Sequence, residues 1–413
     1  MNNTGDDINK TAAPQSASGG VKAADSPGAE SYVCPNCGGL LKWNIKKREI
    51  ACASCGAEFE SDKDNSKIKE HSLDEYDEAE NFGGLDERMV VKCERCGANV
   101  EFSESQTAAA CPMCGSPQVS AARQERGIRP DGIVPFEVDS YDASEMFKSW
   151  VKKRWFAPNK FKYAYQEGKL SGVYIPCWTF DADAEADYIG KGGIIVHERD
   201  SKGNSRARTR WHVVSGRVSR RFDDMLIVAS GDRTAKLIDE AGPYGTQSDS
   251  IPYSPALLSG FMAEHYEITA ADAHNRAREL MYAELKQLSR EQILLRYDEA
   301  MVDRVNPVYA NEGFKLIMIP VWTSAFTFNN KNYMYVINGE TGRVAGERPY
   351  SPVKIALAVL AAIAAAVIMF MALSADQDTQ SASDEFGEFS GNLEYQCEYD
   401  SGSEINDDLQ IEL

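Results

Sequence analysis

The sequence predicts a multidomain protein with two small β zinc ribbons, an α+β domain with a duplicated β element, and one C-terminal transmembrane helix. Three observations carry this prediction. Eight of the 10 cysteines form four C-x-x-C pairs, which fit two metal-binding modules. A long central region alternates strand-like and helix-like runs. An uncharged apolar run, 355–373, follows that region and is long enough to cross a membrane.

The N-terminal part divides into short segments. Residues 1–30 are polar, rich in Ser, Gly, Ala and Asp, and lack the apolar core of a signal peptide. We expect them to be a disordered tail. The cysteines place a first zinc ribbon at 31–60 and a second at 89–119. A polar, acidic connector at 61–88 separates the ribbons, and a helix over 66–80 fits part of it.

Both ribbons have the spacing C-x2-C-x14-C-x2-C. The predicted ligands are Cys34, Cys37, Cys52 and Cys55 in the first ribbon, and Cys93, Cys96, Cys111 and Cys114 in the second. Two residues between ligands let a tight turn aim both sulfurs at one ion, and a glycine after each second cysteine permits a positive φ. Four thiolates fill a tetrahedral zinc site with Zn–S bonds of ~2.3 Å. We therefore expect two structural Zn²⁺ ions with no open position for catalysis.

The central region, 130–350, is predicted to be one α+β domain. Apolar side chains recur at helical spacing in 142–155, which predicts a first helix. A second helix is expected over 269–297, with Thr269 as its N-cap residue.

Two segments of this domain resemble each other. Residues 174–179 and 318–323 are similar at an offset of 144 residues, and an alternating, strand-like run follows each. We interpret them as a duplicated β element; two unrelated strands that begin alike are the alternative. Residues 329–332 predict a hairpin turn. Cys177 matches Val321 in this comparison, so we expect it to be a buried, inert thiol.

The apolar run would span about 28 Å at ~1.5 Å per residue, close to a bilayer core of about 30 Å. A buried core helix is the alternative, but the run lies between a finished domain and a polar tail. We expect a transmembrane helix at 354–374 and an acidic disordered tail at 375–413. That tail carries much of the formal net charge of -19, so the rest of the chain is only mildly acidic.

Flanking charges predict the orientation of the helix. Arg343, Arg348 and Lys354 precede it, whereas no Lys or Arg follows. Positive residues favour the cytoplasmic side, so the N-terminal domains should be cytoplasmic and the acidic tail outside. Reduced metal-binding thiolates persist in the same compartment, which agrees with this topology.

The chain contains no motif typical of an enzyme. It lacks a P-loop, an H-E-x-x-H motif and a nucleophile elbow. Its histidines are scattered: His71, His197, His212, His265 and His274. We expect His71 to be exposed in the connector, His197 and His212 to face each other across a hairpin, and none of the five to be catalytic. The protein is therefore predicted not to be an enzyme.

Two kinds of partner fit the charged residues. A scaffold that binds another protein is the first prediction, and a nucleic-acid-binding module at the membrane is the alternative. The hairpin of the first ribbon carries Lys42, Trp43, Lys46, Lys47 and Arg48, a basic surface with an aromatic ring. A second basic stretch contains Arg206, Arg208, Arg210, Arg217, Arg220 and Arg221. It could face anionic lipid or be a solvated strand paired with Asp223 and Asp224.

Several motifs resemble one family. They are the four CxxCG knuckles and the segments 133–136, 172–178, 253–261, 319–322 and 338–342. Together they resemble a bacterial family of uncharacterised proteins described as TFIIB-type zinc-ribbon-containing, in which some members are labelled primosomal or helicase-like. The resemblance implies bound zinc but no settled activity. A helicase role is rejected, because nothing in the sequence looks able to bind and hydrolyse ATP.

Overall fold

The computed structural model describes residues 34–39, 41–59, 68–73, 85–102, 111–116, 122–159, 170–199, 205–329 and 331–386. These residues divide into two compact units, of which the first ends at Pro349 and the second begins at Tyr350. The predicted tail 1–30, most of the connector, and the end of the acidic tail lie outside the described residues. The first unit contains both cysteine modules and the α+β body.

The first unit consists of strands and three α-helices in its described part. Its early strands are β1 (Leu41–Asn44), β2 (Glu49–Cys52), β3 (Glu58–Phe59), β4 (His71–Ser72), β5 (Leu85–Lys92), β6 (Asn99–Phe102), β7 (Arg123–Ile128) and β8 (Gly132–Ile133). Its later strands are β9 (Ser171–Arg199), β10 (Ser205–Val228), β11 (Ile251–Pro252), β12 (Met262–Glu264), β13 (Glu299–Phe328), β14 (Lys331–Asn338) and β15 (Val344–Gly346). The helices are α1 (Ser140–Lys152), α3 (Asp232–Ala241), the short 3₁₀ helix η3 (Pro255–Leu258) and α4 (Ala270–Leu294).

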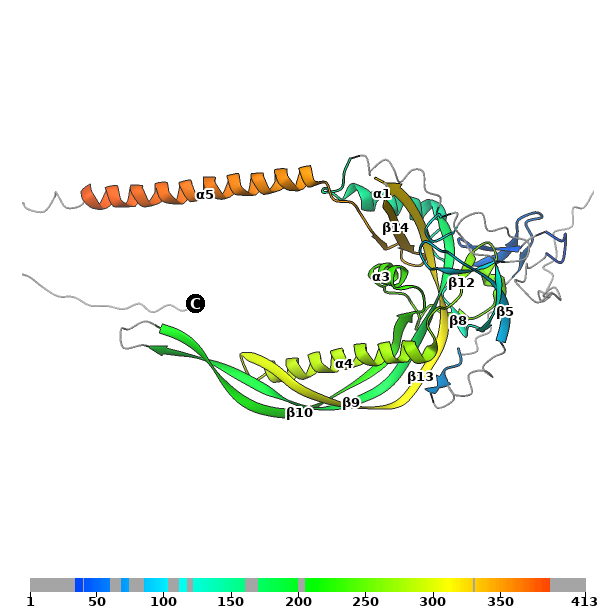
Figure 1. Cartoon of the computed structure of the whole chain (residues 1–413), viewed down its shortest axis with the longest axis horizontal. Coiled ribbons are helices and arrows are strands. Elements are labelled where there is room, and N and C mark those ends of the chain that lie inside the picture. Colours follow the sequence, from blue (N-terminus) through cyan, green and yellow to red (C-terminus); the bar gives the residue numbers. More distant parts are fainter. Residues whose placement is uncertain are drawn as a thin grey trace, which may run out of the picture. The chain divides into compact units, whose positions relative to one another are not determined.

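Three long antiparallel strands form the centre of the body, in the order β10-β9-β13 (Figure 1). Alternate residues are buried in the part of β9 from Ala182 to Tyr188, and Ala182, Ala184 and Ala186 lie on that buried face. Helix α4 packs over the same face through small residues such as Ala273 and Ala277, which are fully buried. Small side chains on both elements allow the helix to approach the sheet closely. The alternation predicted along this strand is confirmed.

The two similar segments pair with each other. Ile175 on β9 lies opposite Ile319 on β13, and Tyr174 lies opposite Pro320. The predicted reversal of the chain is also present, because Phe328 at the end of β13 pairs with Lys331 of the antiparallel strand β14, and Asn329 has a φ of 50°. Each segment therefore belongs to a strand that leads into a hairpin. Their origin by duplication stays a prediction.

Two predicted helices form, with shifted ends. α4 begins after Thr269, whose side-chain oxygen accepts a hydrogen bond from the backbone N–H of Asp272 at 3.2 Å, as expected for an N-cap. α1 begins earlier than the predicted 142–155, because Asp139 rather than a later residue is its N-cap. α3 was not predicted. It is short and its N-cap residue, Gly231, makes no side-chain hydrogen bond, so the usual start pattern is missing.

The second cysteine module is part of the main sheet. β6 pairs with β12, with Glu101 opposite Ala263, and β5 pairs with both β6 and β7. These strands thus extend a twelve-stranded sheet formed by the described residues. The expected connector helix over 66–80 is wrong at β4, where His71 pairs with Phe314 of β13. Pairing with neighbouring strands satisfies backbone groups that would otherwise remain open at a sheet edge.

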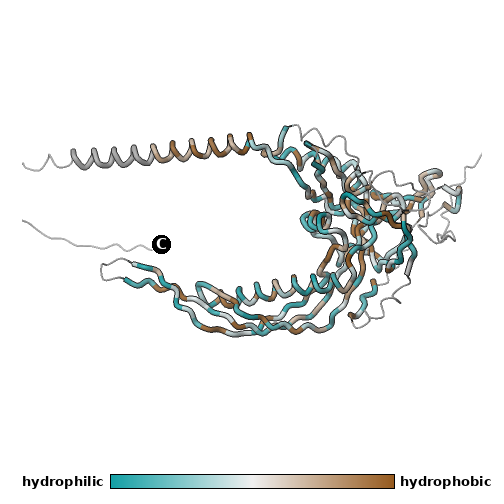
Figure 2. The backbone as a smooth tube through the Cα atoms, viewed as in Figure 1, coloured by the Kyte–Doolittle hydropathy of each residue, from teal (hydrophilic) through white to brown (hydrophobic). Residues whose placement is uncertain are grey.

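The second unit contains one described helix, α5 (Pro352–Phe386). Its segment Pro352–Met371 is long and apolar enough to cross a membrane by length and composition, and none of that stretch is buried. Figure 2 shows the apolar character of its first half. The helix continues beyond the predicted end at 374, into a stretch that we expected to be disordered. Pro352 at its start fits the first turn, where a proline costs no hydrogen bond.

Candidate metal centres

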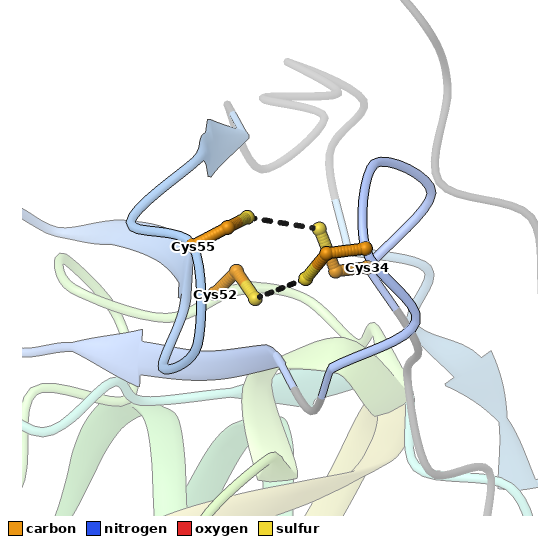
Figure 3. A group of neighbouring side chains, drawn as sticks. Cys34, Cys52 and Cys55 are labelled. Atoms are coloured by element: carbon orange, nitrogen blue, oxygen red, sulfur yellow. Dashed lines mark hydrogen bonds between the residues drawn. The ribbon is translucent and has the colours of Figure 1, made fainter.

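The first cysteine cluster lies at one end of the small sheet β1-β2-β3. Cys34 and Cys37 belong to the turn before β1, Cys52 ends β2, and Cys55 lies in the turn that follows. All four sulfur atoms lie within 4.8 Å of one another. The Sγ–Sγ distance is 3.6 Å between Cys34 and Cys55 and 3.5 Å between Cys37 and Cys52 (Figure 3). The structure therefore brings together the four residues that the spacing predicted.

The second cluster has the same arrangement. Its four sulfur atoms again lie within 4.8 Å of one another, with Sγ–Sγ distances of 3.5 Å between Cys93 and Cys114 and 3.7 Å between Cys96 and Cys111. The glycine after the second cysteine of every pair has a positive φ, as predicted. These glycines are Gly38 at 71°, Gly56 at 72°, Gly97 at 86° and Gly115 at 68°.

The geometry of both clusters fits a tetrahedral metal ion. Sulfurs bound to one ion at ~2.3 Å lie about 3.8 Å apart, close to the separations found here. A disulfide would need a distance of about 2.05 Å. The backbone N–H groups of Gly39 and Ser54 point at the sulfurs of Cys37 and Cys52, each at 3.4 Å, and such donors favour thiolates. Each cluster could therefore hold one metal ion, and four protein ligands leave no open position.

The two centres differ in how far they are buried. In the first, Cys34 and Cys52 are buried, but Cys37 and Cys55 are exposed. In the second, Cys93, Cys111 and Cys114 are buried and Cys96 is half-buried. One side of the first centre thus faces solvent, whereas protein encloses most of the second.

Met113 fixes the second centre to the body. It lies between Cys111 and Cys114, is fully buried, and belongs to the core formed with β9 and β13. Its carbonyl oxygen accepts a hydrogen bond from Thr323 Oγ1 at 3.3 Å, and that of Cys114 accepts one from Asn332 Nδ2 at 3.1 Å. This role of Met113 was not predicted from the sequence. A signal was available, because Met113 is the one apolar residue at that place in the four knuckles.

Trp43 joins the first ribbon to the body. Its ring is buried, and its Nε1 donates to the carbonyl oxygen of Phe136 at 3.5 Å, while its backbone N–H donates to the oxygen of Ser259 at 3.3 Å. Two ion pairs add to this contact, between Lys46 and Asp139 at 3.2 Å and between Arg48 and Glu137.

These contacts correct the prediction of a basic, aromatic surface on the first ribbon. Trp43 alternates with Lys42 along β1 and points inward, so it cannot stack on a base. Lys47 pairs with Glu58, and Lys46 and Arg48 pair with acids of the body. The hairpin therefore offers little free positive charge.

The second basic stretch lies on β10. Arg206, Arg208 and Arg210 are exposed and share one face of the strand, as predicted. The alternative in which this stretch pairs with Asp223 and Asp224 is wrong. Among the described residues, its arginines form ion pairs with Glu198, Glu185, Asp187 and Glu284. Asp224 instead contacts Lys315 at 2.7 Å, because a β-bulge after Phe222 turns it inward.

Two expectations about the histidines are wrong. His71 is buried, and its Nε2 lies 2.7 Å from Asp131, because β4 docks against β13. His197 pairs with Ala207 and His212 with Gly192, so these two histidines do not face each other.

The other two histidines contact carboxylates. His265 lies 3.1 Å from Glu101, and His274 lies 2.9 Å from Glu312. Within the part of the chain that the structure describes, the two cysteine clusters are the groups of side chains arranged to hold a metal ion.

A small hollow lies where the second module meets the body. Arg88, Glu101, Pro176, Glu264 and His265 are among its lining residues. Glu264 is fully buried, accepts a hydrogen bond from Ser230 at 2.8 Å, and has its pKa raised by burial to about 8. The absence of an enzyme activity stays a prediction.

This chain is similar to an uncharacterized protein, YdjG, of Bacillus subtilis (strain 168). The two are 25% identical over 334 residues, which cover 79% of this chain and 92% of the relative. No family model matches the chain, and no solved structure matches it. Membership of a TFIIB-type zinc-ribbon family therefore stays a prediction.

Proposed function

We propose that this protein is a membrane-tethered, cytoplasmic scaffold that recruits or regulates another protein, with two zinc ions in structural sites. One observation carries the proposal. A body with two closed four-cysteine centres ends at β15, and only five residues separate its last strand from the apolar helix α5. Closed sites stabilise a fold but leave no place for a substrate. We therefore expect the protein to function through contacts that the surface of the body makes.

Zinc is the proposed metal for both centres. Four thiolates in a tetrahedron suit zinc, and iron is the main competitor for such a set. Reducing conditions on the cytoplasmic side would keep all eight thiols available. The glycine after each cysteine pair belongs to the CxxCG knuckle and has a positive φ. This conformation also supports the proposed TFIIB-type family.

The proposed topology places the body inside and the acidic tail outside. It is supported by Arg343, Arg348 and Lys354 before the helix and by the absence of Lys and Arg after it. Cys397 is the one cysteine that follows the helix in the sequence. A membrane-impermeant maleimide added to intact, reduced cells should therefore label the chain, and Cys397→Ser should abolish the labelling. Equal labelling of the variant would contradict this topology.

The face of the long sheet opposite α4 supports a protein partner. Residues at alternate positions from those beneath the helix point away from it, and Ile189, Val213 and Met301 share this uncovered face. Val213 is 78% exposed and Met301 53% exposed. Lys191, which pairs with both of these residues, is exposed between them, so this surface offers apolar side chains beside a positive charge to a protein partner.

Site-specific crosslinking of the full chain tests the scaffold. A photo-reactive amino acid at Val213 should give discrete adducts with another protein in cells. The same group at Lys286, which is exposed on α4, should not give those adducts. If Val213 yields only lipid adducts and adducts between copies of this chain, the scaffold proposal fails.

A nucleic-acid-binding module is the second candidate, favoured by the exposed Arg206, Arg208 and Arg210 on β10. Binding should weaken steeply with salt, because neutralising phosphates releases counterions. Replacing the three arginines with glutamine should abolish binding at low salt. Absence of DNA and RNA binding by the unchanged protein at low salt would remove this candidate.

A further inference from the structure

We propose that the two metal centres differ in how readily they release their ions, and that the first ribbon is a metal-controlled cover over an apolar surface of the body. The first centre loses its ion readily and the ribbon then leaves the body, whereas the second centre keeps its ion. The inference rests on the proposal that both centres hold zinc. It adds a regulation to the scaffold, because the surface offered to a partner then depends on the metal content.

The first centre is open to attack by competing ligands. A chelator or an exchanging thiol must reach the metal through an exposed sulfur, and Cys37 and Cys55 are both exposed. Their neighbours Asn36 and Ser54, in the middle of the two knuckles, are exposed as well. An incoming ligand can therefore displace one thiolate at a time without disturbing the rest of the molecule.

The second centre lacks such a path through its second knuckle. Met113 is fully buried, and Ser116, just beyond the last ligand, is 1% exposed. The hydrogen bonds from Thr323 and Asn332 hold the knuckle against β13 and β14. To free Cys111 or Cys114, the chain would have to withdraw Met113 from the core of the body. Release of the ion from the second centre therefore requires part of the core of the body to open, whereas release from the first centre does not.

The first ribbon depends on its metal for its fold. In the described part of the ribbon, the buried apolar residues besides the ligands are Leu41, Trp43, Ile50 and Phe59. A module with so small a core takes much of its folding free energy from the bound ion. Loss of the ion should therefore unfold β1 and β2, and the contacts that they make with the body should be lost with them.

Those contacts cover an apolar surface. β1 packs against η3, and the buried side chains of the ribbon continue into a cluster that contains Phe136 and Leu257. Phe136 stacks on Phe261 with ring centroids 4.3 Å apart. When Trp43 withdraws, this part of the cluster becomes open to solvent. The second centre, fixed in a different core cluster, stays intact and preserves the sheet.

Metal release from the full chain in nanodiscs tests the inequality. Zinc-loaded protein is mixed with 4-(2-pyridylazo)resorcinol, whose absorbance reports the released ion. We expect two phases of one ion each, the fast phase at least about tenfold faster, which corresponds to a barrier difference of about 1.4 kcal/mol. Met113→Ala should accelerate the slow phase, whereas Asn36→Ala, its exposed counterpart in the first ribbon, should leave that phase unchanged.

Hydrogen exchange after the fast phase tests the cover. Amides of 41–52 and of 253–261 should lose protection together, while those of the paired segments of β9 and β13 stay protected. Release of both ions in a single phase, or a fast phase that belongs to the second centre, would overturn the inequality. Fast release without deprotection of 253–261 would overturn the cover. A protein without any bound metal would instead overturn the proposed function.

Discussion

The indole N–H of Trp43 donates to the backbone oxygen of Phe136 at 3.5 Å, and this contact joins the first ribbon to the α+β body. The ring is buried among apolar residues of both parts. The first ribbon is therefore docked on the body, although its sheet is separate from the main sheet.

Replacement of Trp43 with alanine should release the ribbon from the body. Removal of a buried Trp side chain typically costs about 3–5 kcal/mol. We expect the amides of β1 and β2 to exchange faster, with little change in β9 and β13. Lys42→Ala, which alters the exposed neighbour on the opposite face of β1, is the matched control. Unchanged protection in the Trp43 variant would show that the docking contact contributes little.

Truncation of Met113 should destabilise the body itself. Met113→Ala leaves a cavity in a core shared by the second centre and β13, so we expect a loss of about 2–5 kcal/mol in the free energy of unfolding. Asn36→Ala, at the same position of an exposed knuckle, should change stability by less than about 0.5 kcal/mol. Urea titration followed by far-UV circular dichroism compares the two, and equal effects would contradict the anchoring role.

Glu264 should make stability depend on pH. Its pKa rises from 4.5 to about 8 because the folded protein buries it. The folded state therefore keeps the proton that the unfolded chain loses, and stability should fall as the pH rises between these values, by up to about 1.4 kcal/mol per pH unit. Above the folded pKa the decline ends. Urea midpoints at pH 6 and pH 8 should differ less in Glu264→Gln; an identical difference would refute the assignment.

Close packing of α4 on β9 should be sensitive to added volume. Ala277 lies on the face of α4 that packs against the sheet and is fully buried, so Ala277→Leu should cost about 1–3 kcal/mol through overpacking. Leu280, 49% exposed on the same helix, offers a comparison, and Leu280→Ala should have a small effect. Thermal unfolding measures both effects. An unchanged stability of Ala277→Leu would mean that the interface between α4 and the sheet can accommodate a larger side chain.

Local patterns in the sequence predicted much of this structure. The C-x2-C pairs predicted which eight cysteines gather into two clusters of four, because neighbouring residues within a tight turn determine where the sulfurs point. The alternation along Ala182 to Tyr188 identified the face beneath α4. The helix start at Thr269 followed from its capping side chain.

Contacts between distant segments could not be predicted in the same way. The burial of Trp43 depends on Phe136, and that of His71 depends on β13, both far away in the sequence. Neither position carries a local pattern that distinguishes docking from exposure. The merging of the second ribbon with the main sheet similarly depends on β12, more than 150 residues beyond β6.

Metal analysis of the full-length chain, purified in reducing buffer from cells grown without added metal, tests the central claim most directly. We predict two zinc ions per chain, one ion after Cys34→Ser with Cys37→Ser, and one after Cys93→Ser with Cys96→Ser. Less than one zinc per chain in the unchanged protein, or a content that neither pair of substitutions lowers, would contradict the account.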